Sequence, residues 1–119
     1  MKKNILIYDD DAEILFLCKT ILRKYDYNVE TLSRCDDVMS DINKHNPSFI
    51  LMDLWIPEMG GEKAVKLIKE NETAKNIPVF LFSANTDIQD ICKKVNANGY
   101  IEKPFDLKAF VQIIQSHVQ

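Results

Sequence analysis

Glycine is scarce in this sequence: only three of its 119 residues are glycine, at positions 60, 61 and 99. The GxGxxG fingerprint of dinucleotide-binding folds and the P-loop both need more glycines within a few residues than this spacing offers. The sequence therefore excludes both motifs, and any phosphate chemistry must depend on other groups.

Basic charge and paired cysteines are also lacking. The formal net charge is -3 and the pI is near 5.3, so the chain has no basic field for a phosphate backbone, and direct nucleic-acid binding is disfavoured. Cys18, Cys35 and Cys92 form no CxxC pair, and three cysteines cannot all pair with one another. We interpret them as reduced thiols in a cytoplasmic protein.

Long apolar runs are absent as well. The run over residues 5–8 is cut short by three aspartates, so it cannot serve as a signal-peptide core, and no stretch predicts a transmembrane segment. Hydrophobic residues make up 46% and charged residues 28% of the chain, which are ordinary values for a globular protein. We expect one domain, residues 1–119, without a membrane partner.

Short apolar runs and amphipathic segments alternate along the whole chain. The patterns predict strands over 4–8, 28–32, 49–53, 78–82 and 99–101, and helices over 12–25, 33–44, 61–71, 87–95 and 106–117. Asp11, Thr86 or Asp87, and Asp106 are the predicted caps of the first, fourth and fifth helices, and Tyr25, Leu67 and Leu107 fall on apolar helix faces that we expect to be buried. The run 28–32 alternates apolar and polar residues, which favours an edge position. Five strands alternating with five helices predict an α/β fold, a doubly wound parallel sheet with helices on both faces.

Polar side chains follow four of these predicted strands. Asp9 and Asp10 come after the first, Asp53 ends the third, Ser83 follows the fourth, and Lys103 comes shortly after the fifth. Because parallel strands end at one edge of their sheet, we expect these side chains to meet there. Clustered carboxylates repel one another unless a cation neutralises them, and oxygen ligands without His or Cys select Mg²⁺. The sequence therefore predicts a magnesium site.

The same groups suit phosphoryl transfer. Asp53 could attack phosphorus as a carboxylate nucleophile, while Mg²⁺ and Lys103 neutralise the phosphoryl oxygens and the Ser83 hydroxyl donates a hydrogen bond to one of them. The product would be an aspartyl phosphate. Each residue alone has a plainer interpretation, because an Asp after a strand often begins a turn and most lysines lie on the surface.

In their order and spacing, these motifs resemble the receiver domain of two-component response regulators. They are residues 5–11 (ILIYDDD), 53–59 (DLWIPEM), 83–84 (SA) and 99–105 (GYIEKPF), so the resemblance covers essentially the whole chain. It implies a flavodoxin-like sheet of strand order 2-1-3-4-5. It also implies that Asp53 accepts a phosphoryl group from a histidine kinase or a histidine phosphotransfer protein.

The resemblance further implies a role for each polar residue of the metal site. Asp10 and Asp53 would bind Mg²⁺ directly, together with the main-chain carbonyl of Trp55, and Asp9 would act through water. In this family the residues at the positions of Trp55 and Asn85 influence how long the phosphoryl group lasts.

The remaining implied roles concern a switch. Ser83 and Lys103 would hold the phosphoryl group, and the Lys103–Pro104 peptide bond would be cis. Ser83 would then move toward the phosphoryl group while Tyr100 turns inward, which remodels the surface of the fourth helix, fifth strand and fifth helix. A downstream protein would bind this surface, because no DNA-binding or catalytic region follows the motifs within the sequence.

Three other functions compete with a phosphoacceptor module. The first is a receiver-like fold that binds a protein without being phosphorylated. The second is a phosphohydrolase with an aspartyl-phosphate intermediate, but haloacid-dehalogenase-like enzymes carry a second Asp where this chain has Trp55. The third is a flavodoxin-like cofactor binder, disfavoured because the aspartates after the first strand would repel a flavin phosphate.

Overall fold

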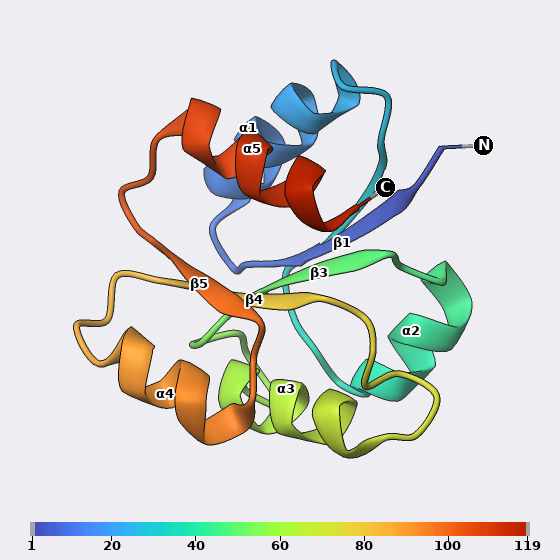
Figure 1. The fold of residues 1–119 in the computed structure, drawn as a ribbon, viewed down its shortest axis with the longest axis vertical. Helices are drawn as coiled ribbons and strands as arrows, with labels where there is room; N and C mark the ends of the chain where they lie inside the picture. Colours follow the sequence, from blue (N-terminus) through green and yellow to red (C-terminus); the bar gives the residue numbers. More distant parts are fainter. Residues whose placement is uncertain (1, 119) are drawn as a thin grey trace.

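The computed structural model describes residues 2–118 and contains five strands that alternate with five helices (Figure 1). In chain order these are β1 (Asn4–Tyr8), α1 (Ala12–Arg23), β2 (Asn28–Leu32), α2 (Val38–His45), β3 (Phe49–Asp53), α3 (Gly61–Glu70), β4 (Val79–Ser83), α4 (Ile88–Val95), β5 (Gly99–Glu102) and α5 (Leu107–His117). The alternation confirms the predicted α/β class.

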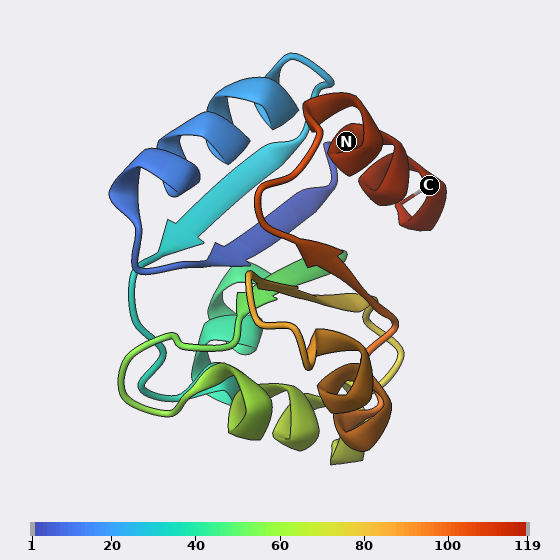
Figure 2. The ribbon, with the colours of Figure 1, turned by 90° about the vertical axis from the view of Figure 1, so that its left-hand side faces the viewer.

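The five strands form one parallel sheet in the order β2-β1-β3-β4-β5. Helices α1 and α5 cover one face, and α2, α3 and α4 cover the other (Figures 1 and 2). The predicted doubly wound topology and strand order are therefore confirmed. The prediction that 28–32 is an edge strand is confirmed too, because β2 pairs with β1 alone.

Side chains alternate across the sheet and divide the core into two clusters. From β1, Leu6 and Tyr8 pack toward α2, α3 and α4, whereas Ile5 and Ile7 pack toward α1 and α5. The central strand β3 is buried along its whole length. A register slip of one residue would turn the buried side chains of β3 to the opposite face of the sheet. The burial of β3 therefore fixes the register of the strand ends and of the side chains that follow them.

Aspartate precedes four of the helices, and three of these side chains accept a capping hydrogen bond, whereas Asp87 before α4 accepts none. The side chains of Asp11 and Asp106 accept hydrogen bonds from the first turns of α1 and α5, which confirms two predicted caps. The predicted start of α2 at residue 33 is wrong. Asp37 caps this helix by accepting from the Ser40 N–H, and the preceding residues 33–37 form a loop that pairs with the segment after β3.

Some residues predicted to be buried lie at the surface. Tyr25 is 47% exposed because α1 ends two residues before it, and Leu107, at the first position of α5, is 37% exposed. Both line a groove between these two helices. Leu67 is 38% exposed because the buried stripe of α3 runs through Ala64 and Ile68.

The three cysteines form no disulfide, as predicted, and the structure shows that all three are buried. Burial raises the pKa of the Cys18 thiol to about 12 and that of Cys35 to about 11. Among residues 2–118, no helix is both long enough and apolar enough to cross a bilayer.

Candidate functional site

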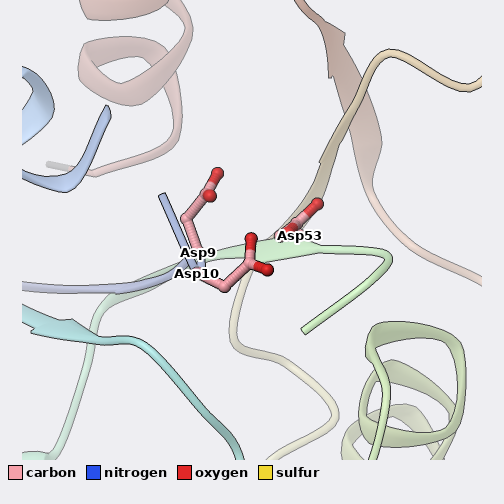
Figure 3. A group of neighbouring side chains, drawn as sticks. All are labelled: Asp9, Asp10 and Asp53. Atoms are coloured by element: carbon pink, nitrogen blue, oxygen red, sulfur yellow. The ribbon is translucent and has the colours of Figure 1, made fainter. Parts of the chain in front are cut away.

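The carboxyl ends of β1 and β3 bring three aspartates together. These strands are parallel neighbours, with Tyr8 opposite Met52, so the residues that follow emerge at the same level of the sheet. Asp9, Asp10 and Asp53 each offer one carboxylate oxygen, and these oxygens all lie within 4.8 Å of one another (Figure 3). Asp9 and Asp53 are buried, whereas Asp10 is exposed.

The ends of β4 and β5 complete the site. Asp53 lies opposite Phe82 across the β3–β4 pair, so Ser83 follows at the same edge, and its side chain is buried. Lys103 comes directly after β5. The cleft between these ends has a volume of about 500 Å³ and is lined by Asp9, Asp10, Asp11, Ile14, Asp53, Trp55, Ser83, Ala84, Asn85 and Lys103. All five polar residues that were predicted to meet do meet here.

Lys103 is the cation within this acidic group. Its Nζ lies 2.6 Å from Oδ2 of Asp9 and 3.7 Å from Oδ1 of Asp53, and it sits 4.6 Å from the centre of the Phe82 ring. The main-chain N–H of Lys103 donates to the carbonyl of Ser83, which ties it to the end of β4. The Lys103–Pro104 bond is cis, as the resemblance implied.

Asp9 is held on both sides of its carboxylate. One oxygen accepts the hydrogen bond from Lys103, and the other accepts the main-chain N–H of Asp11 at 2.9 Å. Asp53 makes the longer ion pair with Lys103, and it lines the cleft. The Asp9 carboxylate therefore has a structural role, whereas the Asp53 carboxylate is open to a ligand.

Burial raises the pKa of the Asp53 carboxyl from an ordinary 3.8 to about 6. The positive charge of Lys103 acts in the opposite direction, and the neighbouring charges of Asp9 and Asp10 raise the pKa further. A divalent cation at the cleft would remove this repulsion. The donors are carboxylate oxygens without His or Cys thiolate, so the residues fit Mg²⁺ better than zinc.

The remaining predicted residues divide between the cleft and the sheet. Trp55 lines the cleft, and its side chain is 70% exposed. The Ser83 hydroxyl accepts the N–H of Asn85 at 3.0 Å, which holds the hydroxyl over the end of β4. Tyr100 lies opposite Leu81 on β5, is partly buried against the core on the α4 side, and does not line the cleft.

Sequence reasoning missed a contact that holds the loop after Asp53. The Cys35 N–H donates to the carbonyl of Pro57, and the Met59 N–H donates back to the carbonyl of Cys35. Arg34 lies 3.4 Å from Glu58, which adopts a positive φ of 78°. Two loops with no regular periodicity make this contact, so no local pattern marks it.

Gly61 closes the same loop. Its N–H donates to the carbonyl of Leu54, and a Cβ at this position would overlap the main-chain carbonyl oxygen of Asp53. The first turn of α3 therefore packs directly on the end of β3. Here glycine is needed for close packing of the backbone.

Comparison with known proteins connects this geometry to a family. The family model of the response regulator receiver domain matches residues 5–115. Protein PilG of Pseudomonas aeruginosa is 28% identical over 97% of this chain and 87% of its own length, and the polar-differentiation response regulator DivK of Brucella ovis is 26% identical over 99% and 98%. The chain spans only 52% of the DNA-binding response regulator MtrA of Mycobacterium tuberculosis and 24% of the transcriptional regulator NtrC of Proteus hauseri.

Solved structures share the fold. The receiver domain of the sensor histidine kinase PA1611 from Pseudomonas aeruginosa superposes with a TM-score of 0.87 over 98% of both chains at 23% identity. That crystal structure holds a magnesium ion coordinated in its active-site cleft.

Proposed function

The chain belongs to the response regulator receiver domain family, and from this premise we propose that Asp53 accepts a phosphoryl group from a histidine kinase or a histidine phosphotransfer protein. Receiver domains are phosphoacceptor signalling modules that interact with histidine kinases, and they are not enzymes acting on a separate substrate. We propose that residues 1–119 form a single domain of this kind. Receiver domains typically work in the cytoplasm, and we propose the same location here.

The observation that carries the proposal is the position of Asp53. It is buried within the sheet yet faces the cleft, beside a lysine and a serine hydroxyl that lie far from it in sequence. A carboxylate in this place can attack the phosphorus of a phosphohistidine, forming an acyl phosphate as the bond from phosphorus to the histidine nitrogen breaks. The exposed carboxylate of Asp10 and the buried one of Asp9 supply the surrounding negative charge that a metal site requires.

We propose that Asp10, Asp53 and the main-chain carbonyl of Trp55 bind Mg²⁺, with Asp9 acting through water. When bound, Mg²⁺ supplies positive charge that neutralises the phosphoryl oxygens. The magnesium ion in the PA1611 receiver domain and the oxygen-only donor set of this cleft both support the assignment. Lys103, anchored on Asp9, would bring its ammonium to the same oxygens.

The proposed switch uses Ser83 and Tyr100. The Ser83 hydroxyl accepts one hydrogen bond, from the Asn85 N–H, and can turn its own hydrogen toward a phosphoryl oxygen. Tyr100 lies on β5, the edge strand that runs beside α4. We propose that a downstream protein binds the face formed by α4, β5 and α5, which is the surface these two residues can remodel.

Mass spectrometry tests the central assignment. Incubation with acetyl phosphate and Mg²⁺ should add one phosphoryl group to the wild-type chain, and borohydride reduction followed by peptide mapping should locate it at Asp53. The Asp53→Asn variant should gain no mass. Asp90→Asn, which removes an exposed carboxylate on α4, should behave like the wild type.

Two results would contradict the proposal. An unchanged mass together with no response to beryllofluoride would favour the phosphorylation-independent binding module. A phosphoryl group mapped to another residue would remove Asp53 from its role.

A further inference from the structure

A basic groove lies beside the outer edge of the sheet. It has a volume of about 320 Å³ and is lined by Asn4, Lys19, Arg23, Asn28, Val29, Glu30, Lys44 and His45. Lys19 and Arg23 come from α1, and Lys44 and His45 come from the end of α2. Helices α1 and α2 cover opposite faces of the sheet (Figure 1), and basic residues from both line the groove together with Asn28, Val29 and Glu30 of β2.

The positive charge of this groove is not balanced locally. Within residues 2–118, Lys19, Arg23 and Lys44 have no carboxylate within 4.0 Å, and Glu30 is the only acidic residue that lines the groove. The C-terminal turns of α1 and α2 favour nearby cations, but Lys19 lies in the middle of its helix. On a chain with a formal net charge of -3, this is a distinct positive region.

One side of the edge strand has main-chain groups that pair with no other strand of the sheet. The Asn28 N–H donates to the carbonyl of Lys3, and the carbonyl of Leu32 accepts the N–H of Asp9, so residues 28, 30 and 32 direct their main-chain groups toward β1. By alternation, Val29 and Thr31 direct theirs away from the sheet. Among the described residues no further strand pairs with β2, which lies at the outer edge beside β1 (Figure 2).

We propose that β2 binds an extended acidic segment of a partner protein, which adds to the sheet as a sixth strand. The main chain of the segment would pair with Val29 and Thr31, and its side chains would point alternately to the two faces of the sheet. Carboxylates on one face would meet Lys19 and Arg23, and those on the other would meet Lys44. The segment therefore carries acidic residues on both of its faces.

Two other occupants fit less well. A second copy of β2 would bring two sets of the same cations together, so like-charge repulsion opposes a dimer through this edge. A nucleic acid could meet the cations but has no strand to pair with Val29 and Thr31. Strand addition accounts for both the charge and the main-chain groups at this edge.

This surface is independent of the proposed phosphoacceptor. β2 and β5 are the two opposite edges of the sheet, so a partner on β2 would leave the α4, β5 and α5 face free. The inference does not rest on the proposed function. It therefore predicts the same binding by the wild type and by Asp53→Asn, both unphosphorylated.

Nuclear magnetic resonance of the full chain tests strand addition directly. The probe is a synthetic peptide with glutamates on both faces of an extended strand and valines between them. We expect the amide signals of Val29 and Thr31 to shift, and their hydrogen exchange to slow, as the peptide is added. A control peptide of the same charge with N-methylated main-chain groups should lose both effects, and a lysine counterpart should not bind.

Charge reversal tests the cations. The double variant Lys19→Glu with Arg23→Glu should bind the acidic peptide about tenfold more weakly or worse. The matched variant Lys63→Glu with Lys66→Glu reverses two exposed lysines on α3 and should bind like the wild type. Circular dichroism shows whether each variant is folded, and all four substituted side chains lie outside the two core clusters.

Three outcomes would overturn the inference. If the N-methylated peptide bound as tightly as the unmethylated one, charge attraction without strand pairing would account for the binding. Equal loss in both double variants would show a general charge effect. Protection of Val29 and Thr31 that rises with protein concentration in the absence of peptide would assign this edge to a second copy of the chain.

Discussion

The ammonium of Lys103 donates a hydrogen bond to Asp9 and makes a longer ion pair with Asp53: its Nζ lies 2.6 Å from Oδ2 of Asp9 and 3.7 Å from Oδ1 of Asp53. These two partners, Lys103 and Asp9, are 94 positions apart in sequence, and the Asp9 side chain is fully buried. The pair thus connects the end of β5 to the end of β1 and holds a cation beside the proposed phosphoacceptor. It also makes the stability of the fold depend on the site.

Replacing Lys103 by Met should destabilise the metal-free protein. The substitution keeps most of the volume of the side chain but leaves the buried Asp9 carboxylate without its cation. We expect a loss of about 3 kcal/mol in the free energy of unfolding, because breaking a buried pair leaves an uncompensated charge. Urea unfolding with a chelator present measures this loss, and Mg²⁺ should restore part of it. An unchanged midpoint would mean that the pair is not a structural contact.

Replacing Asp53 by Asn should stabilise the metal-free protein above neutral pH. The folded protein raises the pKa of this carboxyl from 3.8 to about 6, so the wild type loses stability as pH rises through that window. At about pH 8 the variant should gain at most about 3 kcal/mol, since each pKa unit corresponds to about 1.4 kcal/mol. Near pH 4 the gain should vanish. Urea unfolding across this pH range measures the difference, with Asp90→Asn as the control, and a gain independent of pH would contradict the interpretation.

Trp55 should report metal binding, because it is the only tryptophan and lines the cleft. We expect its fluorescence to change with millimolar Mg²⁺ and to return when the metal is chelated. Asp10→Asn removes a proposed ligand from the surface and should weaken Mg²⁺ binding about tenfold or more. Asp36→Asn, which changes an exposed carboxylate outside the cleft, should leave the titration unchanged. A flat titration of the wild type would count against a metal in this cleft.

Gly61→Ala should be more damaging than Gly60→Ala. A Cβ at position 61 would overlap the main-chain carbonyl oxygen of Asp53, so α3 must move away from β3, at a cost of about 2 to 3 kcal/mol or more. At position 60 the space is open, and the variant meets only the strain of a positive φ of 81°, about 1 kcal/mol. Thermal unfolding of both variants compares the two effects. Equal losses would show that φ strain, and not overlap with Asp53, controls this turn.

Local patterns predicted most of the fold. Apolar runs bounded by turn residues mark β1 and β3 with their observed bounds, because strands this short and this buried need nearly continuous apolar sequence. The alternation of apolar and polar residues marks the half-exposed β2 with its observed bounds. The same patterns place the polar side chains directly after the strands. Since parallel strands end at one edge, a cleft containing Asp53, Ser83 and Lys103 followed from chain order alone.

Local patterns did not predict three features of the structure. These are the start of α2, the exposure of Tyr25 and Leu107, and the pairing of Cys35 with the loop after Asp53. Each depends on neighbours that are distant in sequence, so no short-range periodicity carries it. Strand composition and the order of polar residues are local properties, which is why the chain already specifies its sheet and its site. The way in which the packed elements meet decides which oxygen of the site Lys103 approaches and which basic residues line the groove beside β2, because ion pairs and grooves exist only in three dimensions.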